Sequence, residues 1–99
     1  MAYTIDELIG LALANAIAPI RSAVPRVLSL VAQTESGETG TNLYVWVITS
    51  ERLPESEERR VEKLVLEALS AGQFNFVGVT PYLFFQTKEE RERAGYATS

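Results

Sequence analysis

Residues 8–20 read Leu-Ile-Gly-Leu-Ala-Leu-Ala-Asn-Ala-Ile-Ala-Pro-Ile, and Asn15 is the only one of them with a hydrogen-bonding side chain. A helix that is apolar all round has to be covered all round, and a chain of 99 residues has little else with which to cover it. The segment therefore predicts self-association or a protein partner. Because a membrane span needs roughly 20 apolar residues, we do not expect this stretch to cross a bilayer.

The residues on either side of this segment set the limits of a first helix. Thr4 followed by Glu7 fits a capping box, and Asp6 adds negative charge at the positive end of the helix dipole. The helix is expected to run to about Ala18, where Pro19 either kinks or ends it, because proline has no backbone N–H to donate.

Two segments after this helix have the β-branched and aromatic content of strands. Residues 26–33 predict one strand and residues 43–49 predict a second. The stretch between them, residues 34–42, is rich in Ser, Gly, Thr and Glu. We therefore expect an exposed, long loop that joins the two strands into an antiparallel hairpin.

A second helix is predicted from Pro54 to Gly72, because proline suits the start of a helix and glycine its end. Between them the apolar residues recur at intervals of three and four, which is typical of an amphipathic helix. These residues are Val61, Leu64, Val65, Ala68 and Leu69.

The last third of the chain predicts a strand and a short helix. Residues 74–86 form the strand, and Pro81 within it has to lie at an edge, a bulge or a break, since it cannot donate to a ladder. Thr87 and Glu90 repeat the capping-box pattern, so a short charged helix is expected to end near Gly95. The final residues, 96–99, are expected to fray.

The predicted order is α-β-β-α-β with a short C-terminal helix, which defines the α+β class and a single domain over residues 1–99. We expect a two-layer α/β sandwich, with helices on one face of a mixed sheet of three or four strands.

Both faces of the predicted sheet are apolar, although the helices can cover only one of them. In residues 43–49, Leu43, Val45 and Val47 alternate with Tyr44, Trp46 and Ile48. An uncovered apolar face usually marks an interface. On the first helix, small residues at four-residue intervals form a ridge that another helix could approach. The predicted interaction surface comprises Gly10, Ala14, Ala18, Tyr44, Trp46, Phe84 and Phe85.

Composition argues against most catalytic chemistry. The chain has no Cys and no His, which excludes thiolate nucleophiles, imidazole acid–base catalysis and zinc sites of the Cys/His kind. Its net charge of −4 does not favour nucleic acid or an anionic membrane as a partner. No Lys or Arg precedes Arg21, so the basic flank of a secretory signal is missing and we expect a cytoplasmic protein. We predict no catalytic residues, no metal and no cofactor.

Two functions remain open. The first is a non-catalytic protein-interaction or adaptor domain that forms a homodimer through its apolar surface. The second is a small-molecule or nucleotide-binding domain, in which the glycines Gly37 and Gly40 of the 34–42 loop would bind an anion together with Arg26 or Arg52. An active enzyme ranks below both of them.

The order of elements resembles two known groups of proteins. It is similar to a minimal nucleotidyltransferase, in which a Gly-Ser turn precedes a strand that carries paired metal-binding carboxylates. The corresponding residues 40–44 read Gly-Thr-Asn-Leu-Tyr and contain no carboxylate, so this resemblance implies a degenerate, inactive copy. The order is also similar to that of small, acidic, dimeric secretion chaperones, which implies an apolar surface that is presented to another protein.

Overall fold

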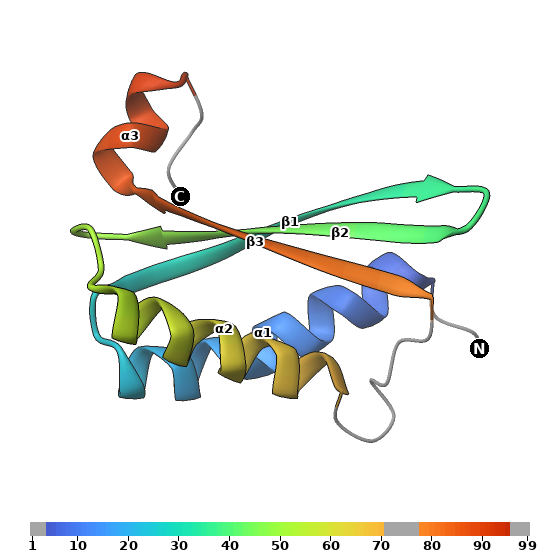
Figure 1. The fold of residues 1–99 in the computed structure, drawn as a ribbon, viewed down its shortest axis with the longest axis horizontal. Helices are drawn as coiled ribbons and strands as arrows, with labels where there is room; N and C mark the ends of the chain where they lie inside the picture. Colours follow the sequence, from blue (N-terminus) through green and yellow to red (C-terminus); the bar gives the residue numbers. More distant parts are fainter. Residues whose placement is uncertain (1–3, 71–77, 96–99) are drawn as a thin grey trace.

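The computed structural model describes residues 4–70 and 78–95, and it confirms the α+β class. Figure 1 shows the described elements, which follow one another in the order α-β-β-α-β-α. They are α1 (Ile5–Ala23), β1 (Val27–Gly37), β2 (Gly40–Thr49), α2 (Glu55–Ser70), β3 (Val79–Thr87) and α3 (Lys88–Arg93).

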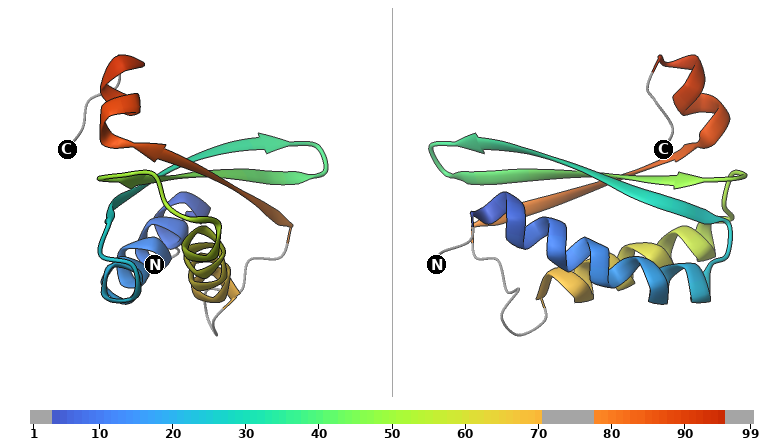
Figure 2. Two further views of the ribbon diagram at one scale, coloured as in Figure 1. Left: turned by 60° about the vertical axis from the view of Figure 1, so that its left-hand side comes forward. Right: turned by 180° about the vertical axis from the view of Figure 1, so that it is seen from behind.

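The three described strands form one mixed sheet in the order β1-β2-β3. β1 runs antiparallel to β2, and β3 runs parallel to β2 after the chain has crossed over through α2. Figures 1 and 2 show α1 and α2 side by side on one face of the sheet, whereas α3 projects beyond the other face at the end of β3. The expectation that the helices share one face therefore holds for α1 and α2 and is wrong for α3.

The hydrophobic core lies between the sheet and these two helices. On β2 the residues that face the helices, Leu43, Val45 and Val47, have no exposed surface. α2 contributes the stripe that its sequence predicted, with Val61, Val65 and Leu69 buried. From α1 the buried residues are Ile9, Ala12, Leu13, Ala16 and Ile20. Burial of one large aliphatic side chain contributes roughly 1.5–3 kcal/mol, so this layer supplies most of the stability.

The first helix is longer than its sequence predicted. It begins after Thr4 as expected, since the Glu7 backbone N–H donates to the Thr4 hydroxyl at 3.2 Å, which is one of the two bonds of the predicted capping box. It then continues through Pro19 to Ala23, so the expected end near Ala18 is wrong. Pro19 is exposed, and the next residue, Ile20, is fully buried. Contacts of Ile20 with the core hold the last turn in place although proline removes one helical hydrogen bond.

The helix α1 is not covered all round within this chain. Most of its large apolar side chains face the core, while the outer side carries small residues such as Gly10 and Ala14 together with polar ones such as Asn15 and Arg21; Leu11, 43% exposed, is the large apolar residue there. Because small side chains expose little apolar area, they lower the free-energy cost of leaving this side of α1 in contact with water. None of the helices in the described part of the chain is long and apolar enough to span a lipid bilayer.

The hairpin corrects the prediction of a long loop over residues 34–42. β1 and β2 stay in register until Gly37 pairs with Gly40, so the connection is only Glu38 and Thr39. Tertiary contacts hold these polar strand ends. The Thr34 hydroxyl donates to an Asp6 carboxylate oxygen of α1 at 2.7 Å.

β3 follows the sequence-based expectation in its second half. It begins at Val79, and the predicted first part of this strand, with the predicted helix end at Gly72, lies outside the described residues. Pro81 lies in an edge strand, as its chemistry requires. The short helix α3 also begins as predicted, because Thr87 and Glu90 form the expected capping box. The expected fraying of residues 96–99 falls outside the described residues.

The last turn of α1 can be tested by truncating Ile20. We expect Ile20→Ala to lower the free energy of unfolding by about 2–5 kcal/mol, because it leaves a cavity in the core. The matched control is Leu11→Ala on the exposed side of the same helix, which should cost less than about 1 kcal/mol. Urea denaturation monitored by circular dichroism measures both values, and equal costs would contradict the packing described for α1.

Candidate interaction surface

The face of the sheet opposite α1 and α2 carries the candidate site, which we call the open face. Strand register places every second residue of each strand on this face. From β1 these residues are Ser29, Val31, Gln33 and Glu35; from β2, Asn42, Tyr44, Trp46 and Ile48; and from β3, Thr80, Tyr82, Phe84 and Gln86.

Four aromatic rings form a continuous cluster at the centre of the open face. Tyr44 lies between its neighbours, with ring centroids 5.6 Å from Tyr82 and 6.3 Å from both Trp46 and Phe84. Trp46 and Phe84 are 5.5 Å apart, with 26° between their ring planes. Such contacts contribute roughly 0.5–1.5 kcal/mol per pair beyond the area that they bury. The rings therefore support one another as one contiguous patch.

This patch is only partly covered by the chain itself. Tyr82 and Phe84 are each 44% exposed, and Tyr44 and Trp46 are half-buried. Ile48, at the end of β2 nearest α3, is buried. The exposed rings retain apolar area that a binding partner could still remove from water.

The open face is nearly free of charge. The chain has 9 basic and 13 acidic residues, yet among the twelve open-face positions only Glu35 is ionisable at neutral pH. Glu35 lies near the hairpin turn, away from Trp46 and Phe84. The remaining polar residues are uncharged Ser, Thr, Asn and Gln. An apolar centre with few charges is typical of the buried part of protein–protein interfaces.

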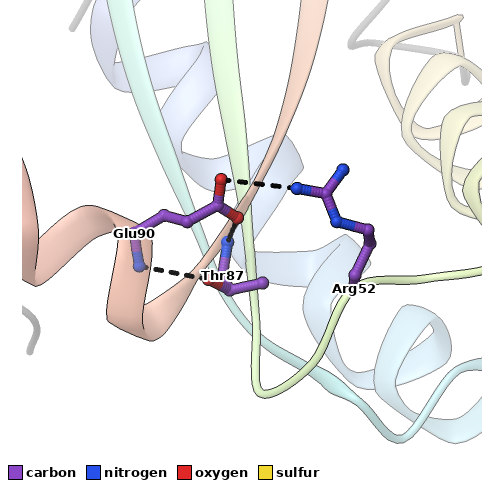
Figure 3. Close-up of polar contacts among 3 residues, drawn as sticks. All are labelled: Arg52, Thr87 and Glu90. Carbon is purple, nitrogen blue, oxygen red and sulfur yellow. Dashed lines mark hydrogen bonds and ion pairs between the residues drawn. The ribbon is translucent and has the colours of Figure 1, made fainter.

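α3 is fixed at one end of the open face by its capping box. The Thr87 backbone N–H donates to a Glu90 carboxylate oxygen at 3.1 Å, and the Glu90 N–H donates to the Thr87 hydroxyl at 3.1 Å. Arg52, from the β2–α2 connection, lies 3.7 Å from the same carboxylate (Figure 3). Arg91 also donates to the Gln86 amide oxygen at 3.2 Å, which attaches α3 to β3.

These contacts lower the pKa of Glu90 below its ordinary value of 4.5. The hydrogen bonds from Thr87 are the main cause, and the positive charges of Arg52 and Arg93 act in the same direction. The ionised form of Glu90 is therefore the one that holds the first turn of α3.

Of the four aromatic residues predicted for the surface, the structure brings three together. Tyr44, Trp46 and Phe84 lie in the cluster, whereas Phe85 lies opposite Val47 and packs against the core. Adjacent strand residues point to opposite faces, so Phe84 and Phe85 cannot share one. The same alternation places Tyr82 on the face of Phe84, although the surface predicted from the sequence did not include Tyr82.

The predicted small-residue ridge lies on a different surface. Gly10, Ala14 and Ala18 are all exposed on α1, which covers the other face of the sheet. A side-chain carbon added at Gly10 would meet no atom within 4 Å. The ridge and the aromatic cluster are therefore two separate surfaces.

The residues of the predicted ligand loop do not converge. Gly37 and Gly40 lie at the hairpin turn, and Arg26 lies roughly 30 Å away, at the opposite end of β1. Arg26 forms ion pairs with Glu51 at 3.4 Å and Glu57 at 3.6 Å. Arg52 is engaged with Glu90.

The described residues of the open face offer ring stacking and apolar contact. No three His, Cys, Asp or Glu side chains of the described part of the chain come close enough to hold a metal ion. The pKa of Glu90 is lowered by its capping bonds with Thr87, so this shift has a structural cause.

Comparison with known proteins finds a similar fold and does not assign the chain to a family. No protein-family model matches the sequence, and no curated protein matches it. The structure is similar to a chain of the zinc transporter CzrB in its zinc form, with a TM-score of 0.53 and 17% identity over 80% of this chain and 88% of that one. A second CzrB structure gives a TM-score of 0.49 at 16% identity, over 76% of this chain and 90% of that one. At this identity the similarity shows a shared fold.

The attachment of α3 predicts a dependence on pH. Because folding lowers the pKa of Glu90, its contribution is fully present above the unfolded value near 4.5 and is lost as the pH falls through the folded value. We therefore expect α3 to loosen in acid before the core unfolds. The amide chemical shifts of α3, followed by NMR from about pH 7 to pH 3, measure this transition.

Two substitutions separate Glu90 from the other acidic residues of α3. Glu90→Gln keeps a hydrogen-bonding side chain and removes the charge, so the acid transition of the first turn should largely disappear. Glu89→Gln, on an exposed side chain one residue away, should leave the transition in place. An unchanged transition in Glu90→Gln would contradict the assignment.

Proposed function

We propose that this chain is a non-catalytic protein-interaction domain that forms a homodimer through its open face. The observation that carries the proposal is the aromatic cluster of Tyr44, Trp46, Tyr82 and Phe84, in which Tyr82 and Phe84 are each 44% exposed, on a face whose strand positions carry a single charge. Completing the burial of such rings releases free energy in proportion to the apolar area that leaves water.

The chemistry of the open face favours a protein over other partners. Aromatic platforms for single-stranded nucleic acid need basic side chains along the backbone of the ligand, and the twelve open-face positions hold no Lys or Arg. The basic residues beside this face are those of α3, where they are interspersed with acidic ones and Arg91 donates to Gln86. Anionic membranes need the same charges. The cluster is also continuous across β2 and β3, which suits the broad surface of a second protein.

A second copy of this chain is the partner that the charge pattern favours. In a two-fold symmetric dimer each surface meets itself, so like charges on it would face one another. Two copies of a chain with net charge −4 can approach through a surface from which charges are nearly absent. The strand positions of the open face meet this condition, and α3 at its end carries equal numbers of acidic and basic residues.

The size of the open face sets the expected strength of the dimer. With about 4.8 Å between strands and 3.3 Å per residue, three strands over seven residues give a face of roughly 15 by 23 Å. Two such faces together cover roughly 700 Å² in projection, which is smaller than the roughly 1,200–2,000 Å² of standard interfaces and typical of weak, transient complexes. We therefore expect a dissociation constant in the micromolar range.

Neither zinc binding nor nucleotide binding forms part of this proposal. Zinc belongs to the description of CzrB, and the described residues of this chain gather no metal-binding group. For a nucleotide, Gly37 and Gly40 would have to act with Arg26 or Arg52, and these residues lie at opposite ends of the hairpin.

The dimer can be tested by placing a charge in the aromatic cluster. Phe84→Lys should raise the dissociation constant at least about tenfold, equivalent to about 1.4 kcal/mol, because each copy would have to bury a lysine charge in the apolar interface. Sedimentation equilibrium over a range of concentrations measures this change.

Leu66→Lys provides the matched control. Leu66 is 37% exposed on α2, on the other side of the molecule, and its substitution should leave the dissociation constant within about twofold of the original. A chain that remains monomeric at high micromolar concentration would contradict the proposal. So would a dimer that Leu66→Lys disrupts and Phe84→Lys leaves intact.

A further inference from the structure

The two edges of the sheet differ in what they can bind. The Thr41 N–H donates to the Gly78 carbonyl at 2.9 Å. Because backbone groups alternate along a strand, the even-numbered residues of β3 point their N–H and C=O groups toward β2, and the odd-numbered residues point theirs outward. Pro81 is one of the outward residues. Because it has no N–H, a fourth strand could not pair continuously along β3.

The outer edge of β1 has no such block. The Ser50 N–H donates to the Arg26 carbonyl at 2.9 Å, so these two residues form a hydrogen-bonded pair. Apart from one irregularity after Val27, every second pair of residues repeats this bonding along the hairpin, up to the pair of Gly37 and Gly40. Between these points, alternate residues direct their backbone N–H and C=O groups away from β2. These residues are Leu30, Ala32, Thr34 and Ser36. None of them is proline, and none is charged.

An apolar groove of about 360 Å³ runs beside this edge, between α1 and β1. Its α1 wall includes Gly10, Leu13 and Ala14, and its β1 wall includes Leu28 and Ala32. The absence of a side chain at Gly10 and the small side chain of Ala14 keep the groove open. A strand added to β1 would direct every second side chain into it.

The charge around the edge is acidic at the hairpin end. Glu35 and Glu38 lie on the hairpin, and the bond from Thr34 to Asp6 brings the acidic start of α1 beside them. All of these carboxylates are exposed. A peptide with a basic residue at this end would meet complementary charge, whereas an acidic peptide would be repelled.

From these observations we infer that the β1 edge binds an extended peptide segment of a partner protein by strand addition. The peptide has apolar side chains at alternate positions and a basic residue beside the hairpin turn. This inference extends the proposed interaction function to a second surface, and it does not depend on the dimer.

The probe is a fluorescein-labelled peptide of about ten residues, in which Val and Thr alternate and two Lys residues stand at one end. Fluorescence anisotropy should show saturable binding to the full chain. A peptide with Glu in place of Lys should bind at least about fivefold more weakly, and adding salt should narrow this difference.

Two substitutions test the backbone edge and the groove separately. Ala32→Pro removes one outward N–H and should weaken binding at least about tenfold, whereas Ala32→Ser keeps the N–H and should stay within about twofold. Gly10→Leu should fill the groove and weaken binding to a similar extent. A side-chain carbon at Gly10 meets no neighbouring atom, and leucine favours helix, so this variant should keep its melting temperature.

The results that would overturn the inference are distinct from those that concern the dimer. Absence of binding, or equal binding by Gly10→Leu and the original chain, would overturn it. A lower oligomeric mass of Ala32→Pro would also overturn the inference, because it would show that a second copy of the chain, and not a peptide, pairs with the β1 edge of the original protein. Phe84→Lys should bind the peptide normally. A monomeric chain that still binds the peptide would contradict the dimer alone, and a dimer that does not bind it would contradict this inference alone.

Discussion

The structure depends on the burial of one row of side chains on the central strand, Leu43, Val45 and Val47 of β2. β2 is hydrogen-bonded to β1 on one side and β3 on the other, and α1 and α2 both pack over this row. Because side chains alternate along a strand, burying this row turns Tyr44 and Trp46 to the opposite face. The same constraint therefore produces the core and the exposed aromatic cluster.

A three-stranded sheet with its two long helices on one side leaves two kinds of surface incomplete, an open face and two edges. The chain protects part of each. α3 lies beyond one end of the open face, where Ile48 is buried, and Pro81 interrupts the outer edge of β3. The aromatic cluster and the β1 edge have no corresponding protection within the described residues. We therefore infer that the aromatic cluster and the β1 edge are the two surfaces that bind partners.

The sequence predicted those features whose cause is local. The helix starts at Thr4 and Thr87 follow from side-chain hydrogen bonds to backbone a few residues away. Predictions failed where distant contacts decide the result. The polar residues 34–42 resemble a loop, yet they continue the strands because the register with β2 extends to Gly37 and Thr34 bonds to α1. For the candidate site, three of the four predicted aromatic residues lie on the open face, and strict alternation would have replaced Phe85 with Tyr82.

By itself the sequence determined the order of elements, the α+β class and the presence of more apolar surface than two layers can cover, because periodicity and composition follow directly from residue identity. Only the tertiary structure decided which apolar surface stays exposed. The solvent-facing side of α1 carries mainly small and polar residues, with Leu11 as its exposed large apolar side chain, whereas the cluster of exposed aromatic rings lies on the sheet. The tertiary structure also showed that Arg26 and the hairpin glycines lie apart and that the β1 edge is open. Such distances and exposures depend on how the layers pack, and packing brings together residues that are far apart in the sequence.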